Sequence, residues 1–411
     1  MIYNTCEFFV RACKILAKAV LIVSFLIVSF VSFAWAQEVN VGVLHSLSGT
    51  MAISERAVAQ ATMLAIDEIN RQGGVLGRTL VPILEDGQSE EAIFRQKAAE
   101  LIEEENVVTV FGGWTSASRQ AMLPVFERTN NLLWYPVQFE GNECSPNIIY
   151  AGAQPNQQAL PALEWAFEQG HQRFFLLGSD YVYPRTTNRI LNAHIAERGG
   201  EVLGEEYFPL GHRDFNAVID TLNAFEEDYL IFNTLNGDSN VAFFEQLYYT
   251  SFSRDTFLIM SFSIAEPEIQ FIGANLLANK YAAWNYFQSL DIPANAAFVE
   301  NYRAEYGGHT VISDPMVHGY VNVYLWKAAV EIAGTFDVDA VRRASYGLTL
   351  NDTPMGTVTI ESNQSIRQMV YVGQIGSDGQ FDIVWDSGEA VRPEPYDPLV
   401  FPGESCDFAV E

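Results

Sequence analysis

The chain has 411 residues, of which 49% are hydrophobic and 13% aromatic, so it is long enough for two globular domains with sizeable cores. Its 51 acidic and 23 basic residues give a formal net charge of −28, and no basic run interrupts this excess. Such a surface repels phosphate backbones and anionic lipid, which excludes a nucleic-acid-binding protein.

Residues 1–36 have the composition of a secretory signal peptide. A positively charged start precedes an uncharged apolar run at 19–33, and the small-x-small sequence Ala34-Trp35-Ala36 ends the segment. We therefore expect cleavage after Ala36 and a mature protein in the periplasm, with an uncleaved membrane anchor as the alternative. No cysteine follows the apolar run, so the pattern does not indicate a lipid anchor.

The chain that follows alternates between strand and helix patterns. Apolar and polar residues first alternate with the period of a strand, and the first helical stripe then ends at Gly73-Gly74. Strands are predicted at 38–46, 78–85, 107–111 and 132–137, and helices begin at Ser54, Ser89 and Thr115. This order is typical of βαβ units with a parallel sheet.

The alternation restarts near residue 156, and NRQGGVLGR (70–78) and AERGGEVLG (196–204) occupy equivalent places in the two halves. Helices are predicted at 156–169, 186–198, 214–226 and 240–249, and strands at 173–178, 201–208, 229–234 and 257–261. A strand at 279–293, helices at 294–306, 315–333 and 337–346, strands at 356–360, 369–375 and 381–385, and an irregular tail follow. We therefore predict an α/β protein of two doubly wound parallel-sheet lobes.

The stretch from Val107 to Arg119 combines a buried strand, two glycines and a helix start. Such a turn leaves unpaired N–H groups and the positive end of the helix dipole facing a crevice. Trp114 and Ser116 would place a flat ring and a hydroxyl at its mouth. Because ligands bind at the carboxyl ends of strands in open α/β sheets, we expect this turn to form half of a small-molecule site.

Polar and aromatic residues recur at the predicted strand ends, and two lobes facing each other would trap a ligand between them. The first half supplies Ser46, Trp114, Ser116, Tyr135 and Gln138, and the second half supplies Tyr181, Asn236, Asp238, Ser263 and Glu266. The alternatives are structural: Trp114 and the tyrosines in the core, Ser116 as a helix cap, and the segment from Asn236 to Asp238 as a plain turn.

Signatures of catalysis are missing from the sequence. It contains no G-x-S-x-G elbow, no Walker A loop and no H-E-x-x-H, and the six histidines are scattered. We therefore expect a binding protein rather than an enzyme, with no cofactor and no metal. Two cysteines, Cys144 and Cys406, follow the leader, and an even count in an exported protein permits one disulfide, with two free thiols as the alternative.

The chemistry of the predicted strand ends favours an uncharged ligand. Hydroxyls and backbone N–H groups can donate to a carbonyl oxygen, and the carboxylates, amides and backbone carbonyls can accept from NH₂ groups. The arginines nearest to these strand ends are Arg119, one turn into its helix, and Arg185, beyond Pro184. Since a carboxylate ligand would be expected to need such a charge, urea or a short amide is the better match.

Six segments resemble the substrate-binding proteins of urea-type ABC transporters. They are GGWTSASR (112–119), LWYPVQFEG (133–141), SPNIIYAGAQPNQQ (145–158), GSDYVYPR (178–185), NTLNGDSNVAFF (233–244) and AAWNYFQSLDIP (282–293). The likeness extends, less closely, to the amide-sensing regulator of amidase operons and to branched-chain amino-acid binding proteins. The sensor has threonine-proline where this chain has Val137-Gln138, which favours urea over the sensor.

The resemblance implies a type I periplasmic-binding fold whose two lobes are joined by three crossovers, at 153–157, 285–290 and 352–368. Lobe 1 would comprise 37–154 and 288–352, lobe 2 would comprise 155–287 and 353–390, and 391–411 would be the tail. It also implies that Ser116 binds the ligand, that Trp114, Tyr135 and Tyr181 line the pocket, and that the partners are an inner-membrane permease and its ATPase. An amino-acid receptor and an amide-sensing regulator are the alternatives.

Overall fold

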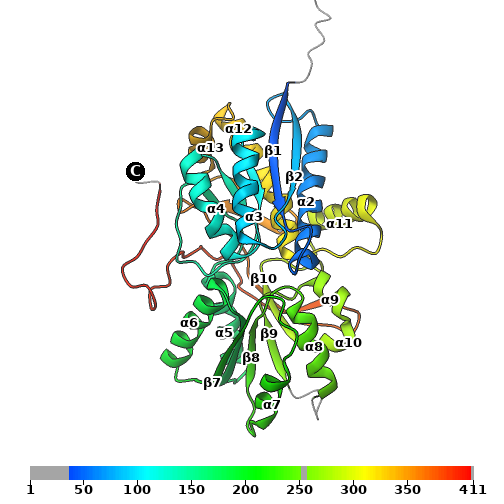
Figure 1. Ribbon diagram of the computed structural model, residues 1–411, viewed down its shortest axis with the longest axis vertical. Helices are drawn as coiled ribbons and strands as arrows, with labels where there is room; N and C mark the ends of the chain where they lie inside the picture. Colours follow the sequence, from blue (N-terminus) through cyan, green and yellow to red (C-terminus); the bar gives the residue numbers. More distant parts are fainter. Residues whose placement is uncertain (1–36, 251–256, 409–411) are drawn as a thin grey trace, which may run out of the picture.

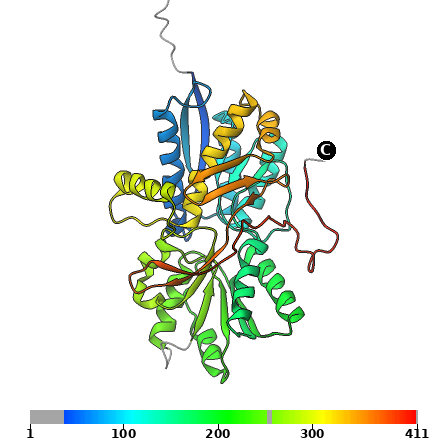
Figure 2. The ribbon, with the colours of Figure 1, turned by 180° about the vertical axis from the view of Figure 1, so that it is seen from behind.

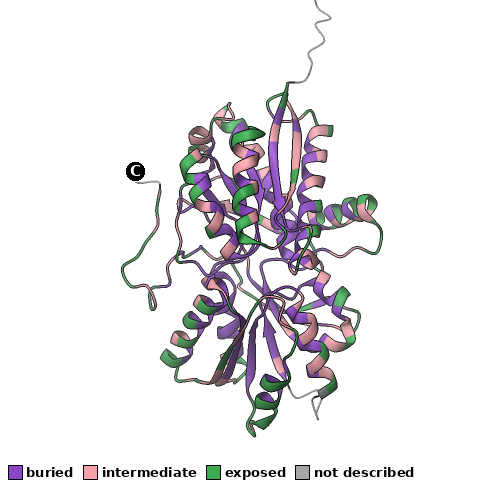
Figure 3. Cartoon of the chain, in the orientation of Figure 1, coloured by how far each residue is buried: buried purple, intermediate pink, exposed green. Residues whose placement is uncertain are grey.

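The computed structural model describes residues 37–250 and 257–408, which form two lobes, one above the other in Figure 1. The predicted leader at 1–36 lies outside these residues. Within the described ranges, no helix is both long enough and apolar enough to span a membrane. Buried residues fill both lobes and the zone where the lobes meet, whereas exposed residues lie on the outer helices (Figure 3).

Lobe 1 is built around a parallel sheet with the strand order β2-β1-β3-β4-β5. Its strands are β1 (Glu38–His45), β2 (Thr79–Asp86), β3 (Val110–Gly112), β4 (Leu133–Tyr135) and β5 (Ile148–Tyr150). Helices α2 (Ala52–Arg71) and α12 (Asp314–Ala333) pack together on one face, and α3 (Glu91–Ala99), a π-helical turn (Glu100–Glu104) and α4 (Ser116–Thr129) follow on the other (Figures 1 and 2). Helices cover both faces, and β3 (VFG) and β4 (LWY), which lie inside the sheet, are buried along their whole length.

Lobe 2 contains a larger sheet, with the order β15-β14-β10-β9-β8-β6-β7. The strands β6 (Arg173–Ser179), β7 (Glu201–Phe208), β8 (Leu230–Thr234), β9 (Leu258–Ser261) and β10 (Tyr281–Trp284) are parallel, and β14 (Tyr371–Ile375) and β15 (Phe381–Asp386) form an antiparallel edge. One face packs on α5 (Ala159–Glu168) and α6 (Val182–Glu197), and the other packs on α7 (Asn216–Ala224), α8 (Ser239–Thr250), α9 (Glu266–Ile272) and α10 (Ala274–Leu277). The predicted fold class is confirmed.

The third predicted crossover differs from the structure. Lobe 1 also contains α11 (Pro293–Tyr306), α13 (Val338–Ser345) and a small antiparallel sheet of β11 (Thr349–Thr353), β12 (Gly356–Ile360) and β13 (Ile366–Arg367). Val358, Ile360 and Ile366 of this sheet are buried in the core of lobe 1. The segment predicted as a crossover at 352–368, and assigned to lobe 2 from residue 353, therefore packs almost entirely with lobe 1.

The chain passes between the lobes at 151–158, 285–292 and 368–370, and a buried polar group joins these crossovers. Asp314, at the start of α12, accepts the backbone N–H of Asn285 at 2.9 Å. His318, one turn later, contacts Asp314 Oδ1 at 3.0 Å and Gln368 Oε1 at 2.7 Å. Gln368 in turn donates to the carbonyl of Ala151 at 3.2 Å. The first two predicted crossovers, at 153–157 and 285–290, lie within the first two observed ones.

The C-terminal tail contacts both lobes. Asp397 lies 2.8 Å from Nε2 of His194, on α6 of lobe 2. Further on, Cys406 forms a disulfide with Cys144, which lies in lobe 1 between β4 and β5, with a Cα–Cα distance of 6.1 Å. The N–H of Phe408 then donates to a carbonyl of lobe 1 at 2.9 Å. The predicted cysteine pair is therefore bonded in the structure, and the tail runs from one lobe to the other.

Candidate functional site

The turn between β3 and α4 has the predicted form, because its two glycines adopt backbone angles that other residues rarely adopt. Gly112 has φ +152° and Gly113 has φ +84°, and a Cβ on Gly112 would lie 1.9 Å from the carbonyl oxygen of Leu44. Thr115 caps the helix by accepting the N–H of Ser118 at 3.0 Å. The cap is therefore Thr115, which leaves the hydroxyl of Ser116 free for another contact.

Ser116 belongs to a buried ionic network instead. Its hydroxyl donates to Oε2 of Glu140 and accepts from Nη1 of Arg119 at 3.0 Å. Arg119 also donates to Glu140 Oε1 at 3.2 Å and, through Nε, to Glu143 Oε1 at 2.8 Å. Ser116 is 1% exposed and Arg119 is 0% exposed. One arginine thus holds two carboxylates and the predicted ligand serine.

Burial has the largest influence on the pKa of each charged group in this network. It would lower the pKa of Arg119, but the two carboxylates raise it well above its usual value. Burial raises the pKa of Glu140, and Arg119 offsets only part of that rise. Burial also raises the pKa of Glu143, but Arg119 outweighs it, so that pKa is lowered. Arg119 is therefore charged and already neutralised by protein groups.

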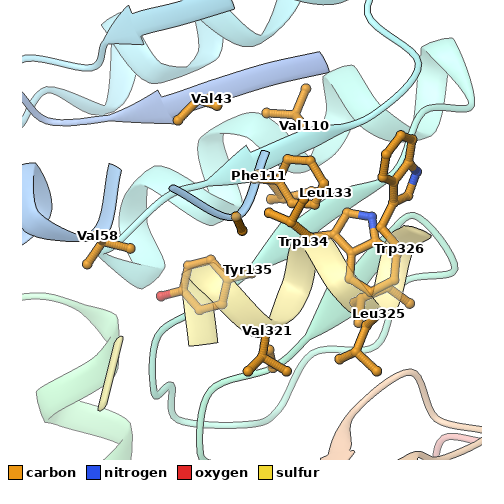
Figure 4. Close-up of a cluster of buried hydrophobic side chains, with 14 of the residues drawn as sticks. Val43, Val58, Val110, Phe111, Leu133, Trp134, Tyr135, Val321, Leu325 and Trp326 are labelled. Carbon is orange, nitrogen blue, oxygen red and sulfur yellow. The ribbon is translucent and has the colours of Figure 1, made fainter. Parts of the chain in front are cut away.

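Aromatic rings complete the enclosure of Arg119. Its guanidinium carbon lies 4.6 Å from the ring centre of Phe139, 5.0 Å from that of Tyr135 and 5.9 Å from that of Tyr150. Figure 4 shows the Tyr135 hydroxyl pointing away from the apolar cluster of Phe111 and the tryptophans. This hydroxyl donates to the backbone carbonyl of Trp114. The predicted residues Trp114, Ser116 and Tyr135 thus lie together.

Gln138 connects this group to lobe 2. Its amide donates to the carbonyl of Phe262 at 2.8 Å and lies 3.3 Å from the Ser263 hydroxyl. Ser263 donates to Oδ1 of Asn236 at 2.9 Å, and the N–H of Asn236 donates to the Ser179 hydroxyl at 3.0 Å. Ser263 and Asn236, at the strand ends of lobe 2, therefore lie beside Gln138, which follows β4 of lobe 1.

The lobes are closed against each other at the rim of this site. Asp238 of lobe 2 accepts from the hydroxyl of Thr50 in lobe 1 and pairs with Arg213 at 3.0 Å. Gly237 has φ +64°, and a Cβ there would lie 2.8 Å from the backbone oxygen of Thr50. Ser54 of α2 also donates to Glu268 of α9 at 2.5 Å. Asp238 thus contacts the opposite lobe at the rim.

Two tyrosines at the start of α6 face lobe 1. Tyr181, which is half-buried, has its ring centre 6.2 Å from that of Tyr183. Burial raises the pKa of both tyrosines, and electrostatic interactions with Tyr135 and Glu140 across the interface raise each pKa further. Tyr183 was missed by the sequence reasoning, although the Tyr-Val-Tyr spacing was visible. Its hydroxyl lies near the Gln138 side chain, without a hydrogen bond of regular geometry.

Glu266 occupies a different place from the other predicted residues. It begins α9, and its Oε1 accepts the N–H of Gln288 in the second crossover at 2.8 Å. Burial is the main reason that its pKa rises to about 8, with the nearby charges of Glu268 and Asp314 adding to the shift. The contact with Gln288 connects Glu266 to the second crossover.

Several buried polar atoms at the interface lack a hydrogen-bond partner within the described residues. They are Nε1 of Trp114, Oε1 of Gln138, the hydroxyl of Tyr183 and Oε2 of Glu266. Because most buried polar atoms in proteins are paired, these are candidate ligand contacts. Cavities of about 540, 720 and 510 Å³ elsewhere are lined by none of the ten predicted strand-end residues. The candidate site is thus an enclosed interface, with two donors and two oxygens left over.

A family profile described as a periplasmic binding protein domain matches residues 39–400. Leu/Ile/Val-binding protein homolog 6 of Brucella melitensis is 22% identical over 85% of this chain and 91% of its own length. A protein named limonene hydroxylase of Geobacillus stearothermophilus is 37% identical over 124 residues, which are 30% of this chain and 23% of that protein.

Solved structures share the fold. The branched-chain amino acid transporter substrate-binding protein LivJ of Streptococcus pneumoniae, crystallised with isoleucine, has a TM-score of 0.74 at 19% identity, covering 87% of this chain and 100% of that chain. At this identity the likeness concerns the fold alone. Within the described residues, no group of three or more His, Cys, Asp or Glu side chains is placed to hold a metal ion.

Proposed function

Because the chain belongs to the periplasmic binding protein family, we propose that it is the solute receptor of an ABC importer and captures urea or a short amide between its lobes. The receptor would hand this solute to an inner-membrane permease driven by a cytoplasmic ATPase. It would act in the periplasm after removal of residues 1–36, without a cofactor and without catalysing a reaction. The observation that carries this proposal is the neutralised state of Arg119.

A ligand carboxylate would need a free cation or several free N–H donors at this interface. Arg119 cannot serve, because its Nε, Nη1 and Nη2 atoms already donate to Glu143, Ser116 and Glu140. Glu140 adds negative charge beside Ser116. A carboxylate placed there would lose its hydration and face another carboxylate, which costs far more than the loss of one neutral hydrogen bond.

The unpartnered atoms suit a neutral planar solute. Trp114 Nε1 and the Tyr183 hydroxyl can donate to a carbonyl oxygen, and Gln138 Oε1 can accept from an NH₂ group. Each such group left unpaired in the closed state costs about 1–3 kcal/mol. A solute with one carbonyl and at least one NH₂ group would satisfy donors and acceptors together, and urea offers two NH₂ groups. Asn236 and Ser263 would complete the opposite wall.

A receptor for branched-chain or other amino acids is the second candidate. It is favoured by the Brucella relative, whose name refers to leucine, isoleucine and valine, and by the structural likeness to the isoleucine complex. An amino acid would require an ammonium partner as well as a carboxylate partner in the cleft. Glu266 is an acidic candidate for the ammonium, but its contacts connect it to the second crossover.

Isothermal titration calorimetry of protein purified from the periplasm distinguishes the two candidates. Urea, acetamide, leucine and isoleucine would be titrated after dialysis against ligand-free buffer. We expect heat and saturation with urea, a weaker signal with acetamide and no signal with either amino acid. Binding of leucine or isoleucine with no response to urea would replace our proposal by the second candidate. Ammonia release from urea would contradict a purely binding role.

A further inference from the structure

The hydrogen-bonding direction of Ser116 is fixed by its neighbours. A serine hydroxyl has one proton and two lone pairs. The proton is donated to Oε2 of Glu140, and one lone pair accepts from Nη1 of Arg119 at 3.0 Å. The remaining capacity of Ser116 is a single lone pair, which can accept from a donor but cannot donate. This reverses the expectation that the hydroxyl donates to a ligand carbonyl.

We propose that Glu140 sets the specificity of the cleft by holding Ser116 as a hydrogen-bond acceptor, so that the ligand must present an N–H group at this point. The proposal rests on the proposed amide-binding function and adds a residue that acts through Ser116. Glu140 is therefore a positioning residue: it is 2% exposed and acts on the ligand through Ser116 without touching the ligand itself. An amide NH₂ group donates to the free lone pair of Ser116. A ligand oxygen at the same place would oppose its own lone pair to that of Ser116, which is repulsive and leaves both oxygens without a donor.

The same geometry explains how one atom could separate an amide from the acid of the same shape. Acetamide and acetate differ only in replacing NH₂ by O⁻, so their volumes are nearly equal. At Ser116, acetamide donates and acetate cannot. Glu140 and Glu143 add two negative charges behind the serine, and the single positive charge of Arg119 offsets them in part. The missing N–H donor and the negative charge both weaken acetate binding. Comparison of acetamide with acetate therefore probes this position directly.

Substitution of Glu140 by glutamine should reverse the direction of Ser116. Glutamine has one oxygen and one NH₂ group in place of two carboxylate oxygens. Its oxygen is expected to face Arg119, because an NH₂ group there would oppose the Nη2 donor that now lies 3.2 Å from Glu140 Oε1. The NH₂ group then faces Ser116 and donates to it. The serine proton becomes free to donate to a ligand oxygen.

Calorimetric titration of wild type and Glu140→Gln with acetamide and acetate tests this inference. We expect the ratio of the acetate to the acetamide dissociation constant to fall by about tenfold or more in the variant, the change typical of one buried hydrogen bond. For wild type, a lower limit for the acetate dissociation constant is sufficient. Thermal unfolding without ligand, and circular dichroism, establish that the variant is folded.

Glu143→Gln is the matched control, because it removes the same charge from Arg119 without contacting Ser116. It should lower the ratio only by the effect of the lost charge on acetate, so the fall in Glu140→Gln should clearly exceed the fall in Glu143→Gln. Ser116→Ala supplies a double-mutant cycle: in its background, Glu140→Gln should change the ratio no more than Glu143→Gln does. A larger effect that persists without the serine hydroxyl would show that Glu140 acts on the ligand by another route.

Failure of this inference is distinguishable from failure of the proposed function. If wild-type protein binds neither urea nor acetamide, the proposed function is wrong. If it binds both, and a folded Glu140→Gln variant keeps the wild-type ratio, the polarity assigned to Ser116 is wrong. If Glu140→Gln does not fold, titration of wild-type protein with N-methylated acetamides tests the inference instead. N,N-dimethylacetamide and N-methylacetamide then differ by a single N–H, and equal affinities would overturn the inference.

Discussion

Replacing Arg119 by methionine should destabilise the protein strongly, because the substitution leaves two carboxylates buried without their cation. Arg119 is 0% exposed, and the carboxylates of Glu140 and Glu143 are 1% and 10% exposed. Removing one partner of a buried ion pair typically costs about 3–5 kcal/mol. Methionine keeps much of the apolar volume, so most of the cost would come from charge. At about 2–4 °C per kcal/mol, the melting temperature should fall by roughly 6–20 °C.

The loss should grow as the pH rises. Without Arg119, burial keeps the folded-state pKa of Glu140 and Glu143 above the unfolded value of about 4.3. A carboxyl with a raised folded-state pKa contributes full stability below its unfolded pKa and loses it as the pH rises through the folded pKa. The variant should therefore lie further below wild type at pH 8 than at pH 5.

Differential scanning calorimetry without ligand is the suitable assay, because urea is both a denaturant and the proposed ligand. Arg128→Met is the matched control on the same helix, since Arg128 and its partner Glu103 have side chains 58% and 49% exposed. Exposed pairs contribute little, so this control should melt close to wild type. A loss in Arg119→Met no larger than in the control, or a loss that shrinks as the pH rises, would refute the reasoning.

Three further substitutions follow from the hinge, the rim and the tail. Gly237→Ala would place a methyl 2.8 Å from a backbone oxygen of lobe 1 and should weaken ligand affinity by calorimetry, whereas Gly170→Ala, at an open position with φ +90°, should not. Burial lowers the pKa of His318, but Asp314 raises it more, so the pKa of the folded protein lies above the usual 6.5. The melting temperature of wild type should therefore fall as the pH rises above 6.5. A folded His318→Gln variant should not show this fall. Cys406→Ser opens a bond spanning 262 residues and should cost about 2–5 kcal/mol in unfolding measurements, while dithiothreitol should change wild type and not the variant.

The sequence was sufficient for features that depend on neighbouring residues. The strand, glycine pair and helix start around Trp114 could be predicted because Gly112 and Gly113 require unusual backbone angles and Thr115 is a preferred cap. The strand-end rule then brought Gln138 and Ser263 together, although they are 125 residues apart. The rule needed only the order of strands and helices, which apolar periodicity supplies.

Features that depend on distant pairing were not visible in the sequence. Arg119 is 24 residues from Glu143, and no local pattern indicates that the two pair beside Ser116. The strand β5 has three residues and β13 has two, and β11 has a single apolar residue, so none has a readable period. Glu266 follows a strand like the other candidates, but α9 begins there and directs its contacts to the hinge.

The bond between Cys144 and Cys406 has a consequence for how a damaged molecule would behave. All of the segment from α5 to β10 lies between these two residues, so the bond encloses it in a covalent ring. A protease that cuts a surface loop of lobe 2 would therefore leave both fragments tethered. Such a nicked protein would migrate as one band in an unreduced denaturing gel and separate into two only after thiol treatment.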